Sequence, residues 1–308
     1  MAAVPADTSE PDGPLDMDYY LTEGLEHEEH QRYRDVSSFT SAIDLRAKEL
    51  RSSNADEFPS TYLVFSHVTQ QHLGTLQIVR NSHYKSLRFF YLRPLRALIV
   101  KMTIGESHES AIRAFEKVFD RKLVALGMGN ILKSLGSTTF NGIDDQSRKE
   151  ANAAFKPYSV RKNKGDWPSM VLECGVSQSP QRLKVDAHWW ADNSVGDVKI
   201  VLLFIVSEKK RTIRLQYWKV EIVPNLNVTR SRPDPTIPRI AFENTIKIDS
   251  QGVTTIPKKG KEIAGGSLNL SCDRLFLRDP VEGVDEENVT FSTEDLKDFY
   301  DKTWQGFD

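Results

Sequence analysis

Apolar residues recur at two different periods along this chain, and the period predicts the type of each element. Between residues 105 and 127 apolar side chains recur every three or four positions, which predicts a long amphipathic helix ended by Gly127 and Gly129. The segment 198–206 is apolar almost without interruption, which is typical of a strand buried on both faces. Residues 211–220 alternate between apolar and polar, which predicts a half-buried antiparallel strand.

The other periodic segments complete the expected order of elements. Helices are predicted at residues 38–52, at about 179–192, and after a capping box that begins at Ser292. Further strands are predicted at residues 61–65, 74–79, 87–91, 96–104, 137–140, 151–157, 170–176, 243–256 and 268–277. The segment 224–238 contains too much proline for a helix or an inner strand.

From residue 105 to residue 220 the predicted order is helix, three strands, helix, strand, strand. A connection through a helix between the strands at 170–176 and 198–206 implies that these two strands are parallel. We therefore expect an α/β (α+β) fold with a mixed central sheet and flanking helices. Its core spans about residues 105–220 of a single domain at 38–308.

The charge of the chain is unevenly distributed. Residues 1–35 hold ten acidic side chains against Arg32 and Arg34, a net charge of −8, whereas the whole chain carries −2, so the remainder carries +6. High charge and low hydrophobicity predict that residues 1–37 form a disordered acidic tail. A basic body is compatible with DNA or RNA as a partner, and the acidic tail offers a contact for another protein.

Several classes of protein are disfavoured by the sequence. The only two cysteines, Cys174 and Cys272, lie in apolar strand-like segments, as expected for buried thiols in a reducing compartment. No apolar run approaches the roughly 20 residues of a membrane helix, and the N-terminus lacks the features of a secretory signal. We expect an intracellular protein, cytoplasmic or nuclear. A glycine-rich phosphate loop and a zinc-type Cys/His cluster are both missing from the sequence.

Four sequence blocks carry a resemblance to known families: KEANAAFKP at 149–157, WPSMVLECGVSQS at 167–179, LKVDAHWW at 183–190 and GDVKIV at 196–201. Together they resemble a set of proteins from filamentous fungi, over about residues 88–305. The order of elements at 105–220 resembles the αβββαβ core of the PD-(D/E)XK (restriction-endonuclease-like) nucleases. It is also similar to a bacterial group with a strand glutamate, a Ser-x-Ser loop and a helix that carries Asp or Lys.

The nuclease resemblance implies hydrolysis of phosphodiesters with Mg²⁺ or Mn²⁺. The metal would polarise the phosphate and lower the pKa of the attacking water, held by carboxylates on two adjacent strands. Glu173 matches the glutamate of the third core strand. The acid of the second strand falls at Asn152, a neutral and weaker ligand, and the lysine expected two positions after Glu173 is Gly175. The resemblance therefore implies a metal site that has lost one carboxylate.

Other side chains complete this candidate site. Gln178, or Lys184 from the following helix, would take the role of the missing lysine, and Glu116 on the long helix would add a metal contact. If the strand register is shifted, the acids that could replace Asn152 are Glu150, Asp144 and Asp145.

Two classes of function are indicated by the sequence, which also leaves a purely structural role open as a third alternative. The first is a nuclease-fold protein that cleaves or binds DNA or RNA, with catalysis weakened at Asn152. The second is a catalytically inactive nuclease fold that serves as a protein-interaction module. Basic and aromatic residues alternate at 83–93 and 211–219 as they do in nucleic-acid binders, but strands with one solvated face give the same pattern. Metal binding or cleavage that depends on Glu173 would distinguish the two.

Overall fold

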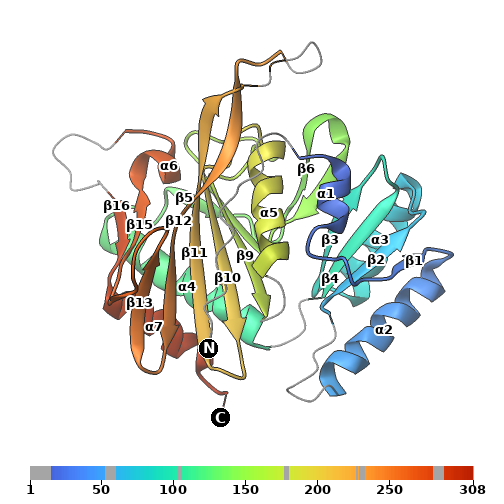
Figure 1. Cartoon of the computed structure of the whole chain (residues 1–308). Coiled ribbons are helices and arrows are strands. Elements are labelled where there is room, and N and C mark those ends of the chain that lie inside the picture. The colour runs from blue at the N-terminus through green and yellow to red at the C-terminus, as the bar shows by residue number, and fades with distance from the viewer. Residues whose placement is uncertain are drawn as a thin grey trace.

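Two large sheets form the framework of the chain (Figure 1). The computed structural model describes residues 15–52, 60–102, 106–176, 180–226, 228, 233–279 and 288–307. Within these ranges the fold is α+β, which confirms the predicted class, but the strands divide between an eight-stranded and a six-stranded sheet. A third sheet has two strands. None of the helices in the described ranges is long and apolar enough to cross a membrane.

The eight-stranded sheet contains the predicted core. Its strands, in spatial order, are β14 (Ile263–Ala264), β13 (Gly252–Pro257), β12 (Thr236–Asp249), β11 (Thr212–Pro224), β10 (Ile200–Ser207), β9 (Met170–Val176), β8 (Ala153–Pro157) and β5 (Leu132–Ser134). Strands β9 and β10 are parallel and are joined by helix α5 (Pro180–Asn193), as predicted, while every other neighbouring pair in this sheet is antiparallel. The order α4, β5, β8, β9, α5, β10 gives the expected helix, three strands, helix and strand.

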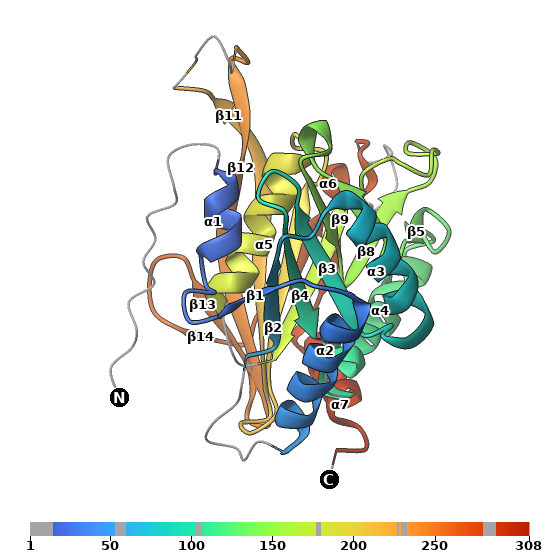
Figure 2. The same ribbon diagram turned by 90° about the vertical axis from the view of Figure 1, so that its right-hand side faces the viewer.

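The six-stranded sheet lies beside this core. Its strands, in spatial order, are β1 (His30–Arg32), β2 (Tyr62–Ser66), β4 (Ala97–Met102), β3 (Leu87–Leu92), β7 (Ser147–Glu150) and β6 (Thr139–Asn141). The strand predicted at 137–140 is β6, so it belongs to this sheet, and β5 takes its place in the core. Helices α2 (Val36–Ser52) and α3 (Gln70–His83) cover the outer face of the sheet (Figure 2).

The strand predicted at residues 74–79 is wrong, because this segment lies inside helix α3. Thr69 caps the helix, and its hydroxyl accepts a hydrogen bond from the backbone N–H of His72. Leu73 and Leu76, three positions apart, are the buried side chains of the helix. The apolar residues of GTLQIV therefore follow the period of a helix, which a window of six residues does not reveal.

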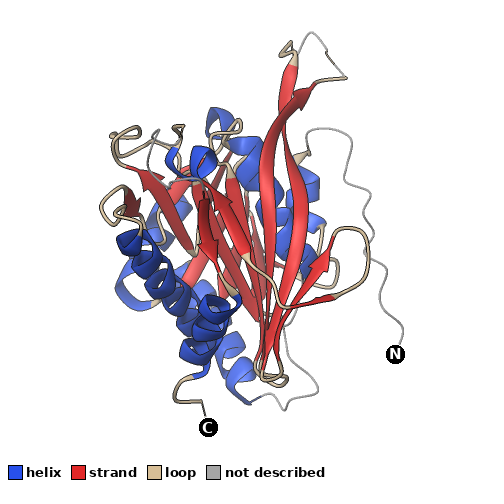
Figure 3. Cartoon of the chain, turned by 90° about the vertical axis from the view of Figure 1, so that its left-hand side faces the viewer, coloured by secondary structure: helices blue, strands red, loops and turns tan. Residues whose placement is uncertain are grey.

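The far face of the eight-stranded sheet is covered by helices α4 (Glu106–Ala125) and α7 (Thr293–Trp304) (Figure 3). The small sheet of β15 (Leu268–Ser271) and β16 (Asn288–Phe291) and helix α6 (Cys272–Phe276) complete this layer. Phe115 of α4 lies at its centre, with its ring 5.0 Å from that of Phe204 and 5.2 Å from that of Phe291. The predicted capping box at Ser292 is confirmed, whereas the strand predicted at 268–277 ends at Ser271 and continues as α6.

Helix α5 lies between the two large sheets and is therefore buried on both sides. Trp189 and Trp190 are each 0% exposed, and their indole N–H groups donate to different elements, Ser147 of β7 and Glu173 of β9. A helix that is buried all round needs partners for each of its polar side chains, because water cannot supply them. This requirement places the charged residues of α5 among the candidate functional groups.

The predicted disordered tail at residues 1–37 is wrong for residues 15–37, while residues 1–14 lie outside the described ranges. Helix α1 (Met17–Thr22) packs beside α5, and Tyr20 is 1% exposed. The Tyr20 hydroxyl donates a hydrogen bond of 2.6 Å to Asp192, and Arg182 Nη1 donates to the carbonyl oxygens of Tyr20 and Glu23 at 2.8 and 3.0 Å. The acidic composition of this segment predicts disorder and does not reveal these few anchoring contacts.

Replacing Tyr20 by alanine should release the segment 15–32 from α5. The Tyr20 ring packs against Phe90. If the segment unfolds together with the whole chain, removing this ring should lower the free energy of unfolding by about 3–5 kcal/mol. Hydrogen exchange at residues 15–25 and urea unfolding measure the effect. The control is Thr22→Ala, since Thr22 is exposed and its hydroxyl bonds within α1. Equal exchange in both variants would contradict the anchoring role.

Candidate functional site

The candidate site lies where the chain crosses from one large sheet to the other. Strand β7 ends at Glu150 and β8 begins at Ala153, so two residues, Ala151 and Asn152, make the crossing. On the neighbouring strand β9, Met170, Leu172 and Cys174 pack towards α4. Glu173 points the other way, into the layer between the sheets, because side chains alternate along a strand.

Two lysines and two carboxylates meet in this layer. Lys149 Nζ lies 3.1 Å from Glu173 Oε1 and 2.9 Å from Asp186 Oδ1. Lys101 Nζ lies 3.4 Å from Glu173 Oε2 and 3.9 Å from Asp186 Oδ2. These four side chains, which we call the acid–lysine cluster, are between 1% and 8% exposed. Their charges cancel, so the cluster is neutral as a whole.

Neutral donors and acceptors complete the bonding of the acid–lysine cluster. Trp190 Nε1 donates a hydrogen bond of 2.9 Å to Glu173 Oε1. The Asn152 side-chain oxygen accepts from the backbone N–H of Cys174 at 2.9 Å and from Lys101 Nζ at 3.3 Å. The ammonium of Lys101 therefore contacts both an oxygen of Asn152 and an oxygen of Glu173.

The buried position of the cluster shifts the pKa of several groups. Burial alone would raise the pKa of the Asp186 carboxyl, but the ammonium groups of Lys149 and Lys101 outweigh it and lower this pKa below its ordinary value. Burial, with a smaller effect of Lys101, lowers the pKa of His108 to about 3. Its Nε2 lies 3.2 Å from the Cys174 carbonyl oxygen. Burial also raises the pKa of the Cys174 thiol to about 12, which makes this thiol unreactive.

Of the predicted site residues, the structure brings Glu173 and Asn152 together through Lys101. Glu116 lies on α4, on the opposite face of the eight-stranded sheet, where it accepts a hydrogen bond of 3.4 Å from Ser134. Burial raises the pKa of its carboxyl. Lys184 precedes Asp186 by two positions on α5 and so points to a different side, where its Nζ lies 5.9 Å from the centre of the Trp218 ring.

Gln178 lies outside the described residues. At Gly175 an added Cβ would meet Leu183 Cδ1 at 3.0 Å, so a lysine there would have to displace α5 side chains. Of the acids considered for a shifted register, Asp144 is exposed in the short helix Ile143–Asp145, and the other two are bound elsewhere. Glu150 pairs with Arg80 of α3 at 2.8 Å, and Asp145 pairs with Arg148 at 3.3 Å.

Three members of the cluster were missed from the sequence: Lys101, Lys149 and Asp186. Each had a weak signal. Lys101 is the one charged residue in the apolar segment ALIVKM, and Lys149 opens the block KEANAAFKP. Asp186 lies on a helix that is apolar on more than one side. A charge inside an apolar element must find a partner, but the sequence does not say which one.

No group of three or more His, Cys, Asp or Glu side chains that could hold a metal ion occurs in the ranges listed above. The arrangement can neutralise and position charge, and its carboxylates are engaged by lysines.

No protein-family profile and no curated protein matches this sequence. Among solved structures, the chain is similar to a candidate nuclease of the DUF820 group from Anabaena variabilis ATCC 29413, with 10% sequence identity and a TM-score of 0.35. The similar region covers 69% of this chain and 90% of that one.

Removing one acid of the cluster should strongly destabilise the fold. Glu173→Ala leaves Lys101 and Lys149 buried with a single carboxylate, so we expect a loss of about 3–5 kcal/mol in urea unfolding. The matched control is Glu109→Ala, which breaks a 2.7 Å ion pair with the exposed Arg113 and should cost less than about 1 kcal/mol. Similar losses in the two variants would contradict a structural role for the cluster.

His108 should make the free energy of unfolding depend on pH. Its folded pKa of about 3 lies below the ordinary value of 6.5, so below pH 6.5 the unfolded chain takes up a proton that the folded chain does not. Stability therefore decreases as the pH is lowered. This residue alone lowers the free energy of unfolding by about 2 kcal/mol between pH 7 and pH 5. His108→Gln should remove this part, with His83→Gln as an exposed control. The measurement is urea unfolding at both pH values, and an unchanged pH dependence in His108→Gln would refute the assignment.

Proposed function

We propose that this chain is a nuclease-like protein that does not hydrolyse phosphodiester bonds and acts by binding a partner. One observation carries the proposal: the ammonium of Lys101 lies 3.3 Å from the oxygen of Asn152 and 3.4 Å from Oε2 of Glu173. These are the two strand side chains that the nuclease resemblance assigns to the metal. A lysine thus supplies the positive charge that the metal would bring.

The distances leave no space between Asn152 and Glu173 for both a Mg²⁺ ion and the Lys101 ammonium. A Mg²⁺ ion lies about 2.0–2.1 Å from each of its oxygen ligands and keeps several waters. An ion shared by Asn152 and Glu173 would occupy the space of the Lys101 ammonium. The other oxygen of Glu173 is already bound by Lys149 and Trp190. Asn152 would in addition be a neutral ligand.

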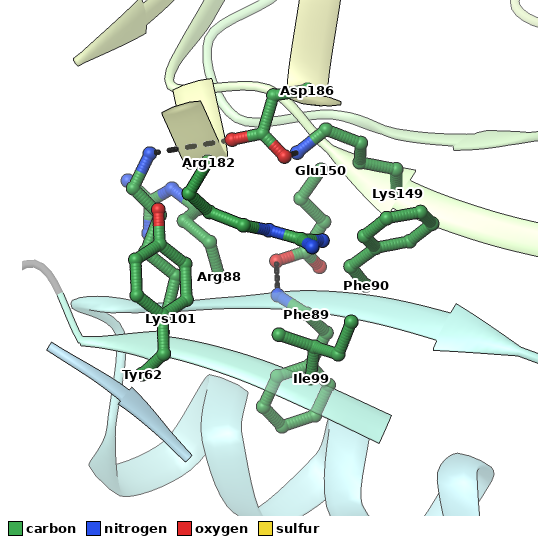
Figure 4. A pocket seen from close by; sticks show the side chains of 10 residues that line it. All are labelled: Tyr62, Arg88, Phe89, Phe90, Ile99, Lys101, Lys149, Glu150, Arg182 and Asp186. Carbon is green, nitrogen blue, oxygen red and sulfur yellow. Dashed lines mark hydrogen bonds and ion pairs between the residues drawn. The ribbon is translucent and has the colours of Figure 1, made fainter. Parts of the chain in front are cut away.

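Access to the cluster also favours a role without hydrolysis. The cavity beside it has a free volume of about 10 Å³, enough for about one water molecule (Figure 4). Glu173 is 1% exposed. An attacking water, a metal with its own waters and a phosphodiester would not fit there together.

Two features support the nuclease-like part of the proposal. The order α4, β5, β8, β9, α5, β10 is that of the PD-(D/E)XK core, with a parallel pair formed across α5. Glu173 lies on the third of these strands and beside Asn152, as the resemblance of the blocks at 149–157 and 167–179 implies. The fold would then be retained, and the acid–lysine cluster would contribute to its stability and not to catalysis.

The partner is either a protein or a nucleic acid, and the N-terminal acidic segment is one candidate contact for a protein. Because residues 15–25 help to cover α5, a pulldown should compare the full chain with a deletion of residues 1–14 only. Deleting residues 1–35 would also remove the contacts of Tyr20 and would confuse loss of binding with loss of stability.

We expect no cleavage of single- or double-stranded DNA or RNA with Mg²⁺ or Mn²⁺, in the wild type, in Asn152→Asp or in Glu173→Ala. Asn152→Asp should instead form an ion pair with Lys101. The double variant Lys101→Met/Asn152→Asp vacates the proposed metal position and should gain Mn²⁺ binding over Asn152→Asp alone in calorimetry. Wild-type cleavage that requires Mg²⁺ or Mn²⁺ and disappears in Glu173→Ala, under conditions where urea unfolding shows that this variant is still folded, would overturn the proposal.

A further inference from the structure

Three polar side chains stand in a row across the six-stranded sheet, next to the acid–lysine cluster. Tyr62 on β2 lies directly opposite Lys101 on β4, and Lys101 lies directly opposite Arg88 on β3. Residues opposite one another on neighbouring strands have their side chains on the same face. The row Tyr62–Lys101–Arg88 therefore presents a phenol, an ammonium and a guanidinium side by side, and Figure 4 shows them gathered at one end of the cavity.

Like charges directly opposite each other on two strands are destabilising, and Lys101 and Arg88 form such a pair. Lys101 has Glu173 and Asp186 as ion partners, whereas none of the carboxylates in the described ranges lies within ion-pair distance of Arg88. Arg88 Nη1 donates to the carbonyl oxygens of Lys85 and Leu87, and its buried Nε has no hydrogen-bond partner there.

The acidic groups near Arg88 already have cationic partners. The acid–lysine cluster is neutral, and Glu150 is paired with Arg80. Glu150, Glu109 and Glu173 act on Arg88 from beyond ion-pair distance. Glu150 and Glu173 are held by Arg80 and by the two lysines, and Glu109 is exposed, so that water screens it. Arg182 adds a further cation to the lining of the same cavity. A largely buried cation without an anion is costly, and a bound anion would remove the cost.

Entry to the cavity is through Arg88. Of the ten residues that line it, Arg88 has an intermediate exposure and the other nine are buried. The cavity holds about one water-sized group. A single oxygen of a tetrahedral anion can therefore enter, while the remaining oxygens stay at the guanidinium in the mouth.

We propose that the row Tyr62–Lys101–Arg88 is a binding site for an oxyanion, and specifically for a terminal phosphate group. One phosphoryl oxygen enters the cavity and accepts from the Lys101 ammonium and the Tyr62 hydroxyl. Two others accept from the Arg88 guanidinium, whose planar fork suits bidentate contact with phosphate. This site needs no metal ion and lies on the six-stranded sheet, outside the nuclease-like core, so it does not depend on whether that core hydrolyses its ligand.

The test is phosphate-dependent thermal unfolding of the full chain, without metal ions and at constant ionic strength set with sodium chloride. The probes are inorganic phosphate, a nucleoside 5′-monophosphate, the same nucleoside without phosphate, and a short oligonucleotide with and without a 5′-phosphate. At one hundred times the dissociation constant we expect a rise in Tm of about 5 °C with the phosphate-bearing probes. The two oligonucleotides distinguish a nucleic-acid end from free phosphate.

Two variants and one control make the test specific. Arg88→Gln should abolish the shift and also raise the Tm of the ligand-free protein, since it removes the repulsion from Lys101. Tyr62→Phe keeps the fold and should weaken phosphate binding several-fold. Arg113→Gln, an exposed arginine of α4, should behave as the wild type. An equal shift in Arg88→Gln and the wild type, or equal shifts with and without phosphate on the probe, would overturn the proposal.

Discussion

The packing of this protein depends on one buried ion network between two sheets. Each of its four charges comes from a different element: Lys101 from β4, Lys149 from β7, Glu173 from β9 and Asp186 from α5. Apolar burial is non-directional, but buried charges require short distances to particular partners. The network therefore fixes how the six-stranded sheet sits against α5 and the eight-stranded sheet.

Under the proposed function, the same network would allow a nuclease-like arrangement to be kept without its chemistry. Carboxylates at the centre of such a fold repel one another unless cations neutralise them. Here the cations are lysines that arrive from an additional sheet, so their charge belongs to the chain and is present whenever the chain is folded. Asn152 fits this arrangement, because a neutral amide can accept from Lys101 without unbalancing two lysines and two acids.

The sequence was most informative where a single element carried its own pattern. The helix at 105–127, the buried strand at 198–206 and the crossover that joins this strand to the one at 170–176 follow from local periodicity, and Glu173 could be placed on a strand in the same way. The second sheet, helix α3 and the ordered segment at 15–32 were missed. Lys101 meets Glu173 across 72 positions of the chain, and Tyr20 meets Asp192 across 172. Contacts of this kind depend on tertiary packing, which local composition does not encode.

The long hairpin of β11 and β12 has a consequence for self-association. β10 pairs with β11 up to Lys219, and β13 pairs with β12 from Asn244 onwards, so the ribbon beyond these points has two unpaired edges (Figure 1). Open edges of this kind invite strands from other molecules. Pro224 and Pro238 lack the backbone N–H that an incoming strand would need, and Glu221 and Arg239 place exposed charges beside them. The proline-rich stretch thus disfavours edge-to-edge aggregation.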